Sequence, residues 1–506
     1  LLSRGLGDVY KRQLQVGASI DGKYDYEFVD GNLEKDPESK ILKLLATGEF
    51  KYFGVTVMPG PQLKQAIPIS KKAKKAFPEV NIIWGGYFAS NQYKVCLESG
   101  FVDFIINGPG DTAFPNLLEA LENKTDVAAI KNLIYLKEGI AFKTAKEALL
   151  DQDTLPPLPY GKLNENYPLK NYLAKTFLGQ KTLAYHSSFG CPFTCSFCAV
   201  VPIYNARWKG KSASLVANDT LLLKEKFGVD SVEFHDNNFF TSRKRVVEFA
   251  KLIKEENIVW WGEGRIDTLN KYSDEDLKLM HEAGCKMIFL GAETGNDEVL
   301  KKMDKGGTQT GDEIRTFVKR MGEVGIIPEL SFVLGLPGES EKQVMKQILE
   351  DIDFIKEIKE INPDAEIIIY LYSPVPTEGS ELYEEIKKAG FSFPERLEDW
   401  LDPAWEKFDL RKNPLTPWLT PQMVDKIQNF ETVLNGYYPT TTDFRVKGGK
   451  KKLLRLISAW RYKTGFYKWP YEIKLLHKIW KYRQPEIEGF YSCLLYTSPS
   501  PRDRSL

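Results

Sequence analysis

The chain has 506 residues, of which 42% are hydrophobic and 27% are charged, and its 69 basic and 69 acidic residues leave no formal net charge. This composition is ordinary for a globular protein, and the length predicts about three domains. Six cysteines are too few for a disulfide-stapled secreted scaffold. The sequence shows no signal peptide, and no apolar run reaches the ~20 residues of a membrane-spanning helix. We therefore expect a cytoplasmic protein with free thiols.

Changes in composition divide the chain into segments. Residues 1–13 and 491–506 resemble translated sequencing-adaptor sequence, and we expect them to be non-native. Between them we expect a first domain at 14–145, a linker at 146–180, a second domain at 181–395 and a helical carboxyl-terminal region at 396–490.

The first domain alternates predicted strands with predicted helices. Strands are expected at 23–32, 52–61, 80–90 and 102–107. The helical spacing between the second and third strands continues through Pro68. Such alternation predicts a doubly wound, Rossmann-like (flavodoxin-like) sheet, which binds ligands beyond the carboxyl ends of its strands. We expect the first strand of this sheet, and part of its first helix, to be missing before Leu14.

Three cysteines lie within eight residues, at Cys191, Cys195 and Cys198. A disulfide framework does not fit the low cysteine count. A zinc site would need four ligands, and although His186 or His235 could supply the fourth, neither has the paired spacing of zinc ligands. Three thiolates can instead hold three irons of a 4Fe–4S cluster and leave the fourth iron open.

The remaining cysteines stand apart from this loop. Cys96 and Cys285 lie alone in apolar stretches, which is typical of buried, inert thiols. Cys493 belongs to the adaptor-like tail. These three residues are therefore not expected to bind metal.

Six strand–helix units follow one another in the second domain. The units begin at residues 181, 229, 258, 286, 327 and 365. Such units imply parallel strands with right-handed crossovers, hence a curved sheet or a partial (β/α)6 barrel. Function is expected at the carboxyl ends of the strands, and the cysteine loop follows the first strand.

The cysteine pattern CxxxCxΦC, with Phe197 beside the third cysteine, resembles the radical S-adenosylmethionine (radical SAM) family. The resemblance implies a 4Fe–4S cluster on the three cysteines, whose open iron chelates S-adenosylmethionine (SAM), and a contact between Phe197 and SAM. Reductive cleavage of SAM then gives a 5′-deoxyadenosyl radical. Because an open-iron cluster is oxygen-labile, we expect activity only under anaerobic, reducing conditions.

The ends of the later strands resemble the SAM-binding motifs of the same family. Asp236 and Asn237 resemble the second-strand pair that holds the SAM amino group, with an asparagine in place of the usual second acid. Arg265 resembles the third-strand arginine, Glu293 the fourth-strand ribose contact, and Gly335 the fifth-strand glycine near the adenine. Taken alone, such residues could equally be turn glycines and helix caps.

The first domain resembles the cobalamin (B12)-binding domain found ahead of many radical SAM enzymes. The resemblance implies that four turn glycines bind cobalamin: Gly85, Gly86, Gly108 and Gly110. In the family these turns read Gly-Gly-x-His and Gly-Glu-Gly-Glu, whereas here Phe88 and Pro109 interrupt the pattern. No histidine precedes His186, so the lower axial position of the cobalt would be empty or filled by another group. A Rossmann-like module without a ligand is the alternative.

The carboxyl-terminal region is basic and aromatic. It holds six of the ten tryptophans, and from Arg445 to Arg483 there are thirteen Lys and Arg residues against one acid, Glu472. Three interpretations are open: a helical cap that packs its aromatics on the barrel, an amphipathic surface for an anionic membrane or lipid-like substrate, and a nucleic-acid surface. No recognised RNA-binding module follows the barrel, so nucleic acid is the least favoured partner.

Together these features resemble cobalamin-binding radical SAM enzymes of the anaerobic magnesium-protoporphyrin IX monomethyl ester cyclase and class B methyltransferase group. The resemblance favours methyl transfer to an unactivated carbon of a small-molecule or lipid-like substrate, with flavodoxin or ferredoxin as electron donor. Radical cyclisation, oxidation or rearrangement without methyl transfer is the first alternative. An iron–sulfur binding or redox protein without turnover is the second. The expected location is cytoplasmic, with a membrane-peripheral contact through the carboxyl-terminal region as a further hypothesis.

Overall fold

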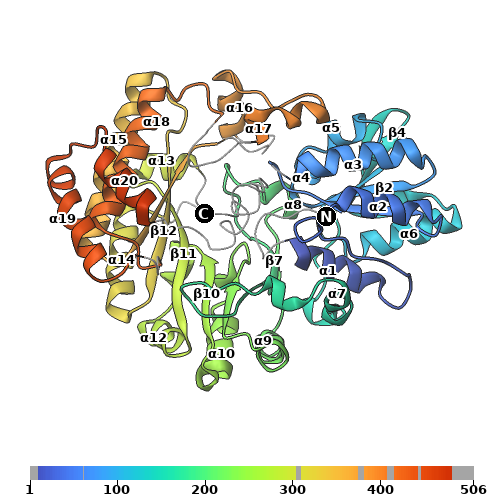
Figure 1. The fold of residues 1–506 in the computed structure, drawn as a ribbon, viewed down its shortest axis with the longest axis horizontal. Coiled ribbons are helices and arrows are strands. Elements are labelled where there is room, and N and C mark those ends of the chain that lie inside the picture. Colours follow the sequence, from blue (N-terminus) through green and yellow to red (C-terminus); the bar gives the residue numbers. More distant parts are fainter. Residues whose placement is uncertain are drawn as a thin grey trace.

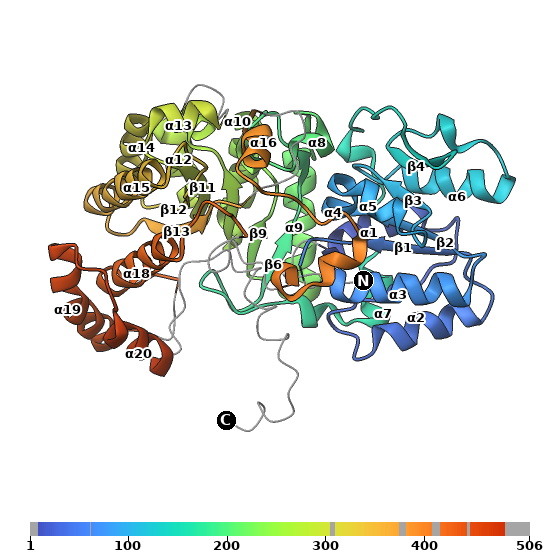
Figure 2. The same cartoon turned by 90° about the horizontal axis from the view of Figure 1, so that it is seen from above.

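The computed structural model describes residues 9–60, 62–303, 309–373, 381–406, 415–442 and 446–480. These residues form two α/β domains side by side, with a group of carboxyl-terminal helices on the far side of the second domain (Figures 1 and 2). The expected fold class is confirmed, because a Rossmann-like sheet is followed by a partial parallel barrel and then by helices. Among the described residues, no helix is both long enough and apolar enough to cross a membrane.

The first domain contains a five-stranded sheet in the order β1-β2-β3-β4-β5. Strands β1 (Tyr52–Thr56), β2 (Asn81–Gly85) and β3 (Phe104–Ile106) are parallel, whereas β4 (Leu133–Lys137) and β5 (Ile140–Lys143) add an antiparallel hairpin. The helices of this domain are α1 (Val9–Ile20), α2 (Pro37–Ala46), α3 (Leu63–Ala76), α4 (Gly86–Asn91), α5 (Tyr93–Glu98), α6 (Ala113–Asn123) and the short η1 (Val127–Ala129). Apolar side chains are buried on both faces of the sheet, as in a doubly wound fold.

Two features of the first domain differ from the sequence prediction. The strand expected at 23–32 is wrong: residues 25–30 run as irregular backbone outside the sheet. In the described sheet β1 is the edge strand, with β2 as its neighbour, so residues 23–32 do not extend the sheet. Helix α1 also begins at Val9, inside the segment set aside as non-native. The helix through Pro68 is confirmed by α3.

The second domain is built on six parallel strands in the order β13-β12-β11-β10-β9-β6. These are β6 (Thr182–Tyr185), β9 (Ser231–Phe234), β10 (Val259–Gly264), β11 (Cys285–Glu293), β12 (Ile327–Leu334) and β13 (Glu366–Leu371). A small antiparallel hairpin, β7 (Ser188–Gly190) with β8 (Trp208–Gly210), frames the cysteine loop. The six predicted strand–helix units are therefore confirmed. The proline-rich residues 374–380 after β13 lie outside the described residues.

Helices cover the outer face of the curved sheet (Figure 1). They are α9 (Ala213–Phe227), α10 (Arg243–Ile253), α12 (Asp274–Glu282), α14 (Gly311–Val324) and α15 (Glu341–Ile361). The connections also contain α8 (Val201–Tyr204), which contacts α4 of the first domain, α11 (Ile266–Leu269), α13 (Asp297–Lys302), α16 (Glu381–Lys388) and the short turns η4 (Phe239–Thr241) and η5 (Lys254–Glu256). Alternate strand residues face these helices, such as Phe234 and Leu330 in the main apolar core. Ser273 caps α12 through a capping box with Asp276.

The segment expected to be a linker folds onto the barrel. It contains η2 (Gln152–Thr154), α7 (Tyr160–Asn166) and η3 (Leu169–Tyr172). Leu14 and Phe28 of the first domain are buried in the same apolar core as Leu163 and Tyr167 of this segment. The Tyr172 hydroxyl donates a buried hydrogen bond of 2.6 Å to Asp30. The two domains therefore share one continuous core at this junction.

The region after the barrel contacts both domains. It contains η6 (Leu397–Leu401), α17 (Pro403–Glu406), α18 (Pro421–Tyr437), α19 (Gly449–Thr464) and α20 (Tyr471–Trp480). Trp400 is buried against Phe88 of the first domain, with ring centroids 4.8 Å apart, whereas α18 packs on the barrel helix α15. Trp400 therefore packs on the first domain, whereas the cap interpretation expected it on the barrel, and Trp460 and Trp469 are 51% and 62% exposed.

Candidate active site

The cysteine loop lies at the carboxyl end of β6, between the two domains. Gly190 enters the loop with φ +76°, and a Cβ there would clash with the Arg207 carbonyl oxygen, so the turn needs glycine. Cys195 is buried, and Cys191 and Cys198 are half-buried. The Cys198 amide donates to the Cys195 carbonyl at 3.0 Å, which wraps the loop into a turn. Three thiols in one short loop are donor types that suit an iron–sulfur cluster. In the described part of the chain, however, no three His, Cys, Asp or Glu side chains are gathered closely enough to hold a metal ion.

Arg265 is the side chain that holds this loop through a contact with Cys195. Its Nη1 donates to Cys195 Sγ at 2.9 Å, and its Nε and Nη2 form a bidentate pair with Asp267 at 2.9 and 2.8 Å. The guanidinium also lies 3.8 Å from the centre of the Phe193 ring. The sequence pointed to Arg265, whereas Asp267, which orients it, was missed because nothing in its spacing marks it.

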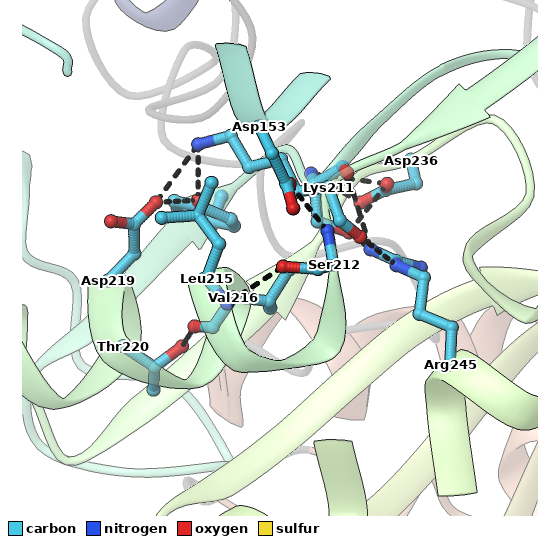
Figure 3. Close-up of polar contacts among 11 residues, drawn as sticks. Asp153, Lys211, Ser212, Leu215, Val216, Asp219, Thr220, Asp236 and Arg245 are labelled. Atoms are coloured by element: carbon cyan, nitrogen blue, oxygen red, sulfur yellow. Dashed lines mark hydrogen bonds and ion pairs between the residues drawn. The ribbon is translucent and has the colours of Figure 1, made fainter. Parts of the chain in front are cut away.

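The two neighbouring residues Asp236 and Asn237, which were predicted as a pair, have different surroundings in the structure. Asp236 is fully buried, and its two oxygens accept the Ser187 amide at 3.1 and 3.0 Å, the Ser187 hydroxyl at 2.8 Å and the Ser188 hydroxyl (Figure 3). Three donors make four hydrogen bonds to the carboxylate, so in this structure Asp236 fixes the strand end from which the cysteine loop leaves. Asn237, by contrast, lines the cavity between the domains.

A polar network behind Asp236 holds the hairpin and α9 together. Arg245 donates to the carbonyls of Ser187 and Lys211, at 3.3 and 2.7 Å. Lys211 forms an ion pair with Asp219 at 2.9 Å, and the Ser212 amide donates to Asp153 at 2.7 Å (Figure 3). Arg245 and Ser187 are buried, and Lys211 and Asp219 are half-buried, so the network anchors the frame of the cysteine loop.

The predicted residues on β11 and β12 lie in strained or tightly packed backbone. Glu293 is a buried non-glycine residue with φ +65°, a strained conformation that is concentrated at functional sites. Gly335 has φ +83°, and a Cβ there would meet Leu419 at 2.5 Å. The Trp418 indole donates to the Gly335 carbonyl at 2.9 Å. Phe197 packs in the apolar cluster beside these strand ends.

A second polar group, which the sequence did not reveal, lies inside the barrel. The two ring nitrogens of His235 lie 3.1 Å from Glu233 and 3.3 Å from Glu263. The other oxygen of Glu233, Oε1, is buried and has no hydrogen-bond partner in the described part of the chain. The His186 ring lies 6.4 Å from the His235 ring, which links this group to the cavity wall. The alternation of side chains along β9 and β10 could have predicted that these residues point into the barrel. It could not have predicted that they contact one another.

A cavity of about 450 Å³ lies between the two domains. The four turn glycines that the resemblance implies for cobalamin binding all line it: Gly85, Gly86, Gly108 and Gly110. From the barrel side, His186 and Asn237 line it as well. Gly86 has φ +85°, and a Cβ there would lie 2.6 Å from the Thr56 hydroxyl. The glycines thus form a cradle that side chains would fill, which fits a large flat cofactor approaching the backbone.

Lys146 joins the two domains at the rim of this cavity. Its ammonium donates to the carbonyls of Asn107, after β3, and Ile203, in α8, the latter at 3.0 Å. Burial, together with the charges of Arg207 and Lys143, lowers the pKa of Lys146 to about 7. Sequence reasoning missed this residue because its partners are backbone carbonyls.

Comparison with known proteins agrees with this geometry. Residues 185–352 match the Radical SAM superfamily. The chain is 25% identical over 474 residues to an anaerobic magnesium-protoporphyrin IX monomethyl ester cyclase of Rubrivivax gelatinosus, covering 88% of this chain and 77% of that protein. It is 26% identical over 335 residues to an uncharacterized methyltransferase of Pyrococcus horikoshii, covering 65% and 70%. It is 28% identical over 253 residues to the hopanoid C-3 methylase of Methylococcus capsulatus, covering 48% and 45%.

Two solved structures share the fold of both domains. The cobalamin-dependent SAM radical enzyme OxsB, with aqua-cobalamin and SAM bound, has a TM-score of 0.61 at 17% identity, covering 93% of this chain and 72% of that one. The radical SAM methyltransferase TsrM of Kitasatospora setae, with cobalamin and a 4Fe–4S cluster bound, has a TM-score of 0.58 at 16% identity, covering 76% and 75%. The superfamily match thus covers residues 185–352, and both domains of the chain share the fold of these two structures.

Proposed function

We propose that this protein is a cobalamin-dependent radical SAM methyltransferase that methylates an unactivated carbon of a small-molecule or lipid-like substrate. The observation that carries the proposal is the cavity, which is bounded by four turn glycines on one side and by His186 and Asn237 on the other. The cysteine loop leaves the same strand end that bears His186. A corrinoid and a SAM-binding cluster would therefore face each other across one space.

The residues present fit these groups. Cys191, Cys195 and Cys198 would hold the cluster, with Arg265 donating to Cys195. Phe197, Asn237, Glu293 and Gly335 would bind SAM, and the turn glycines would bind cobalamin. When bound, the cluster and SAM supply a 5′-deoxyadenosyl radical, and cobalamin supplies the methyl group.

The names of the relatives support methyl transfer over other radical chemistry. The Methylococcus relative is named a methylase, and the Pyrococcus relative is named a methyltransferase. Cyclisation or oxidation without methyl transfer is the second candidate. It is favoured by the match to the magnesium-protoporphyrin cyclase, which extends over 88% of this chain.

One experiment separates these functions. The protein, reconstituted anaerobically with iron, sulfide and hydroxocobalamin, is reduced and incubated with methyl-labelled SAM. Release of 5′-deoxyadenosine together with label on cobalamin supports the methyltransferase, whereas 5′-deoxyadenosine without labelled cobalamin supports the cyclase-type alternative. Protein carrying Cys198→Ala is the control and should give neither product. Absence of 5′-deoxyadenosine from the unaltered protein would contradict both candidates.

The partners of this enzyme are part of the same proposal. Reductive cleavage of SAM needs a low-potential electron, which flavodoxin or ferredoxin would deliver in the cytoplasm. A contact with the membrane surface would bring a lipid-like substrate to the enzyme. The exposed Trp460 and Trp469 support this contact through the carboxyl-terminal helices.

A further inference from the structure

The outer face of α19 carries a stripe of exposed apolar side chains. Leu453, Leu456 and Trp460 are 45%, 73% and 51% exposed, and their spacing places them on one side of the helix. On the inner side, Leu454 is fully buried and Tyr462 is 4% exposed. Helix α19 is therefore apolar on two faces, of which the fold uses only one.

Helix α20 and the turn before it carry further exposed apolar side chains. Tyr471, Leu475 and Ile479 recur every four residues and are 70%, 58% and 61% exposed. In the turn, Phe466 and Trp469 are 42% and 62% exposed. Large exposed apolar side chains that gather on one element mark an interaction site rather than ordinary surface. We call the exposed apolar side chains of α19, of this turn and of α20 together the hairpin face.

The hairpin that presents this face is firmly held. Arg461 forms an ion pair with Glu472 and donates to the carbonyls of Lys468 and Trp469 at 2.7 and 3.1 Å. The Tyr462 ring stacks on Tyr437 of α18, with centroids 4.5 Å apart. The hairpin lies at the end of the molecule away from the first domain (Figures 1 and 2).

Basic side chains surround the hairpin face. Within 446–480 the basic residues that are exposed are Lys447, Lys450, Lys452, Arg455, Lys463, Lys468, Lys474 and Lys478. The single acid in this range, Glu472, is paired with Arg461. The hairpin face is therefore cationic as well as apolar. Its single acid is in an ion pair and does not offset the excess of positive charge.

The charge and the apolar side chains together select the partner. A nucleic acid would use the cations and the aromatic rings, but it would leave the aliphatic Leu456, Leu475 and Ile479 in water. An anionic bilayer uses both sets, because lysines attract the headgroups while Trp and Leu enter the boundary between headgroups and acyl chains. We propose that the hairpin face binds the surface of an anionic membrane. This deepens the membrane contact of the proposed function, on which it rests for its purpose, by naming the face and the lipid charge, and it can be tested apart from methyl transfer.

The test is co-sedimentation of the full chain with vesicles of phosphatidylcholine alone or with roughly a third phosphatidylglycerol. Binding should be stronger to the anionic vesicles and should weaken in high salt. The double variant Leu456→Gln and Leu475→Gln should lower binding by about tenfold at every salt concentration, since it removes the inserted apolar groups. The double variant Lys452→Gln and Lys478→Gln should weaken binding only at low salt.

Matched controls lie on other helices. Leu222→Gln and Leu252→Gln change leucines that are 42% and 46% exposed on α9 and α10, and they should leave vesicle binding unchanged. Because all these positions are exposed, thermal melting should be unaffected throughout. The proposal is overturned if the protein ignores anionic vesicles at low salt, if the controls weaken binding as much as the hairpin variants, or if the hairpin lysines serve binding of a transfer RNA while vesicles are not bound.

Discussion

At the scale of single residues, the described cysteines differ by their surroundings. Cys195 lies within hydrogen-bonding distance of Arg265, whereas Cys96 and Cys285 are buried in the apolar cores of the two domains. Burial raises the pKa of both core thiols well above its ordinary value, so they stay protonated and are poor metal ligands.

We expect replacement of Cys191, Cys195 and Cys198 by alanine to abolish the iron–sulfur cluster. Iron and sulfide content after anaerobic reconstitution measures the effect. Cys96→Ala and Cys285→Ala serve as controls, and they should keep the cluster while lowering the free energy of unfolding by roughly 1–2 kcal/mol through small cavities. A cluster that survives the triple change would show that the loop is not its site.

The sequence predicted the residues that carry chemistry better than the residues that position them. The cysteines, Arg265 and the turn glycines follow local patterns. The structure places the glycines along the cavity and Arg265 against Cys195. Asp236 was expected to face a ligand, yet it accepts hydrogen bonds from Ser187 and Ser188. Its partners lie almost fifty residues away, so no local pattern could reveal them.

At the scale of elements, helix α15 holds the loop that follows Glu293. Asp351 of α15 accepts a hydrogen bond from the Thr294 hydroxyl at 2.5 Å and one from the Gly295 amide at 3.3 Å. Burial raises the pKa of Asp351 from 3.8 to about 7, and the two hydrogen bonds oppose that shift only in part. The folded protein therefore retains a proton that the unfolded chain loses.

This proton makes stability depend on pH. Between about pH 4 and pH 7 the folded state binds more protons than the unfolded state, so the contribution of Asp351 is lost as the pH rises through this range. Asp351→Asn keeps an acceptor without the titration, so its stability relative to the unaltered protein should rise from pH 5 to pH 8. The gain should not exceed a few kcal/mol, since one pKa unit corresponds to roughly 1.4 kcal/mol. Urea unfolding at both pH values measures it, and a pH-independent difference would contradict the assignment.

The turn between β2 and α4 is the element on which corrinoid binding depends. Gly86→Val forces a side chain into a left-handed backbone, beside the Thr56 hydroxyl and at the cavity wall. We expect this variant to lose bound corrinoid, measured by absorbance after reconstitution and desalting. Gly100→Val is the matched control, because Gly100 has φ +75° with open space around it. Both variants should melt at lower temperature, but corrinoid loss in both would mean that strain alone is responsible.

Helices and strands were predicted correctly where a local sequence pattern defines them. The prediction failed where a strand depends on pairing with a distant segment. The buried strands β11, β12 and β13 read as apolar runs, and the helices between them carry regular periodicity and caps. Residues 23–32 have a similar strand-like composition, but a strand also needs a neighbour. The neighbouring strand is absent from the described sheet, and no property of these ten residues could show this.

At the scale of the whole molecule, the segment after the barrel clamps the first domain in place. Trp400 is 4% exposed and packs on Phe88, and its ring also stacks on Phe393 at 6.0 Å. Phe88 belongs to α4, the helix that begins at Gly86. The cavity wall is thus supported by residues more than three hundred positions away.

We expect Trp400→Ala to lower the free energy of unfolding by about 3–5 kcal/mol, as for other large core truncations, and to reduce corrinoid retention. Trp469→Ala is the matched control, since Trp469 is 62% exposed, and it should change stability little. Chemical unfolding of the two variants in parallel gives the comparison. Equal losses would mean that Trp469 contributes to packing, contrary to its place on the hairpin face.

The shared core of the two domains has a consequence for dividing the enzyme. Leu14 and Phe28 are buried with Leu163 and Tyr167, and Asp30 accepts the buried hydrogen bond of Tyr172. A cut near residue 145, followed by separation of the pieces, would expose apolar side chains on each piece and remove the Tyr172 hydroxyl from the Asp30 carboxylate. Neither piece is an autonomous folding unit in this sense. We expect the two pieces, when mixed, to reassociate through this shared core and so regain their stability.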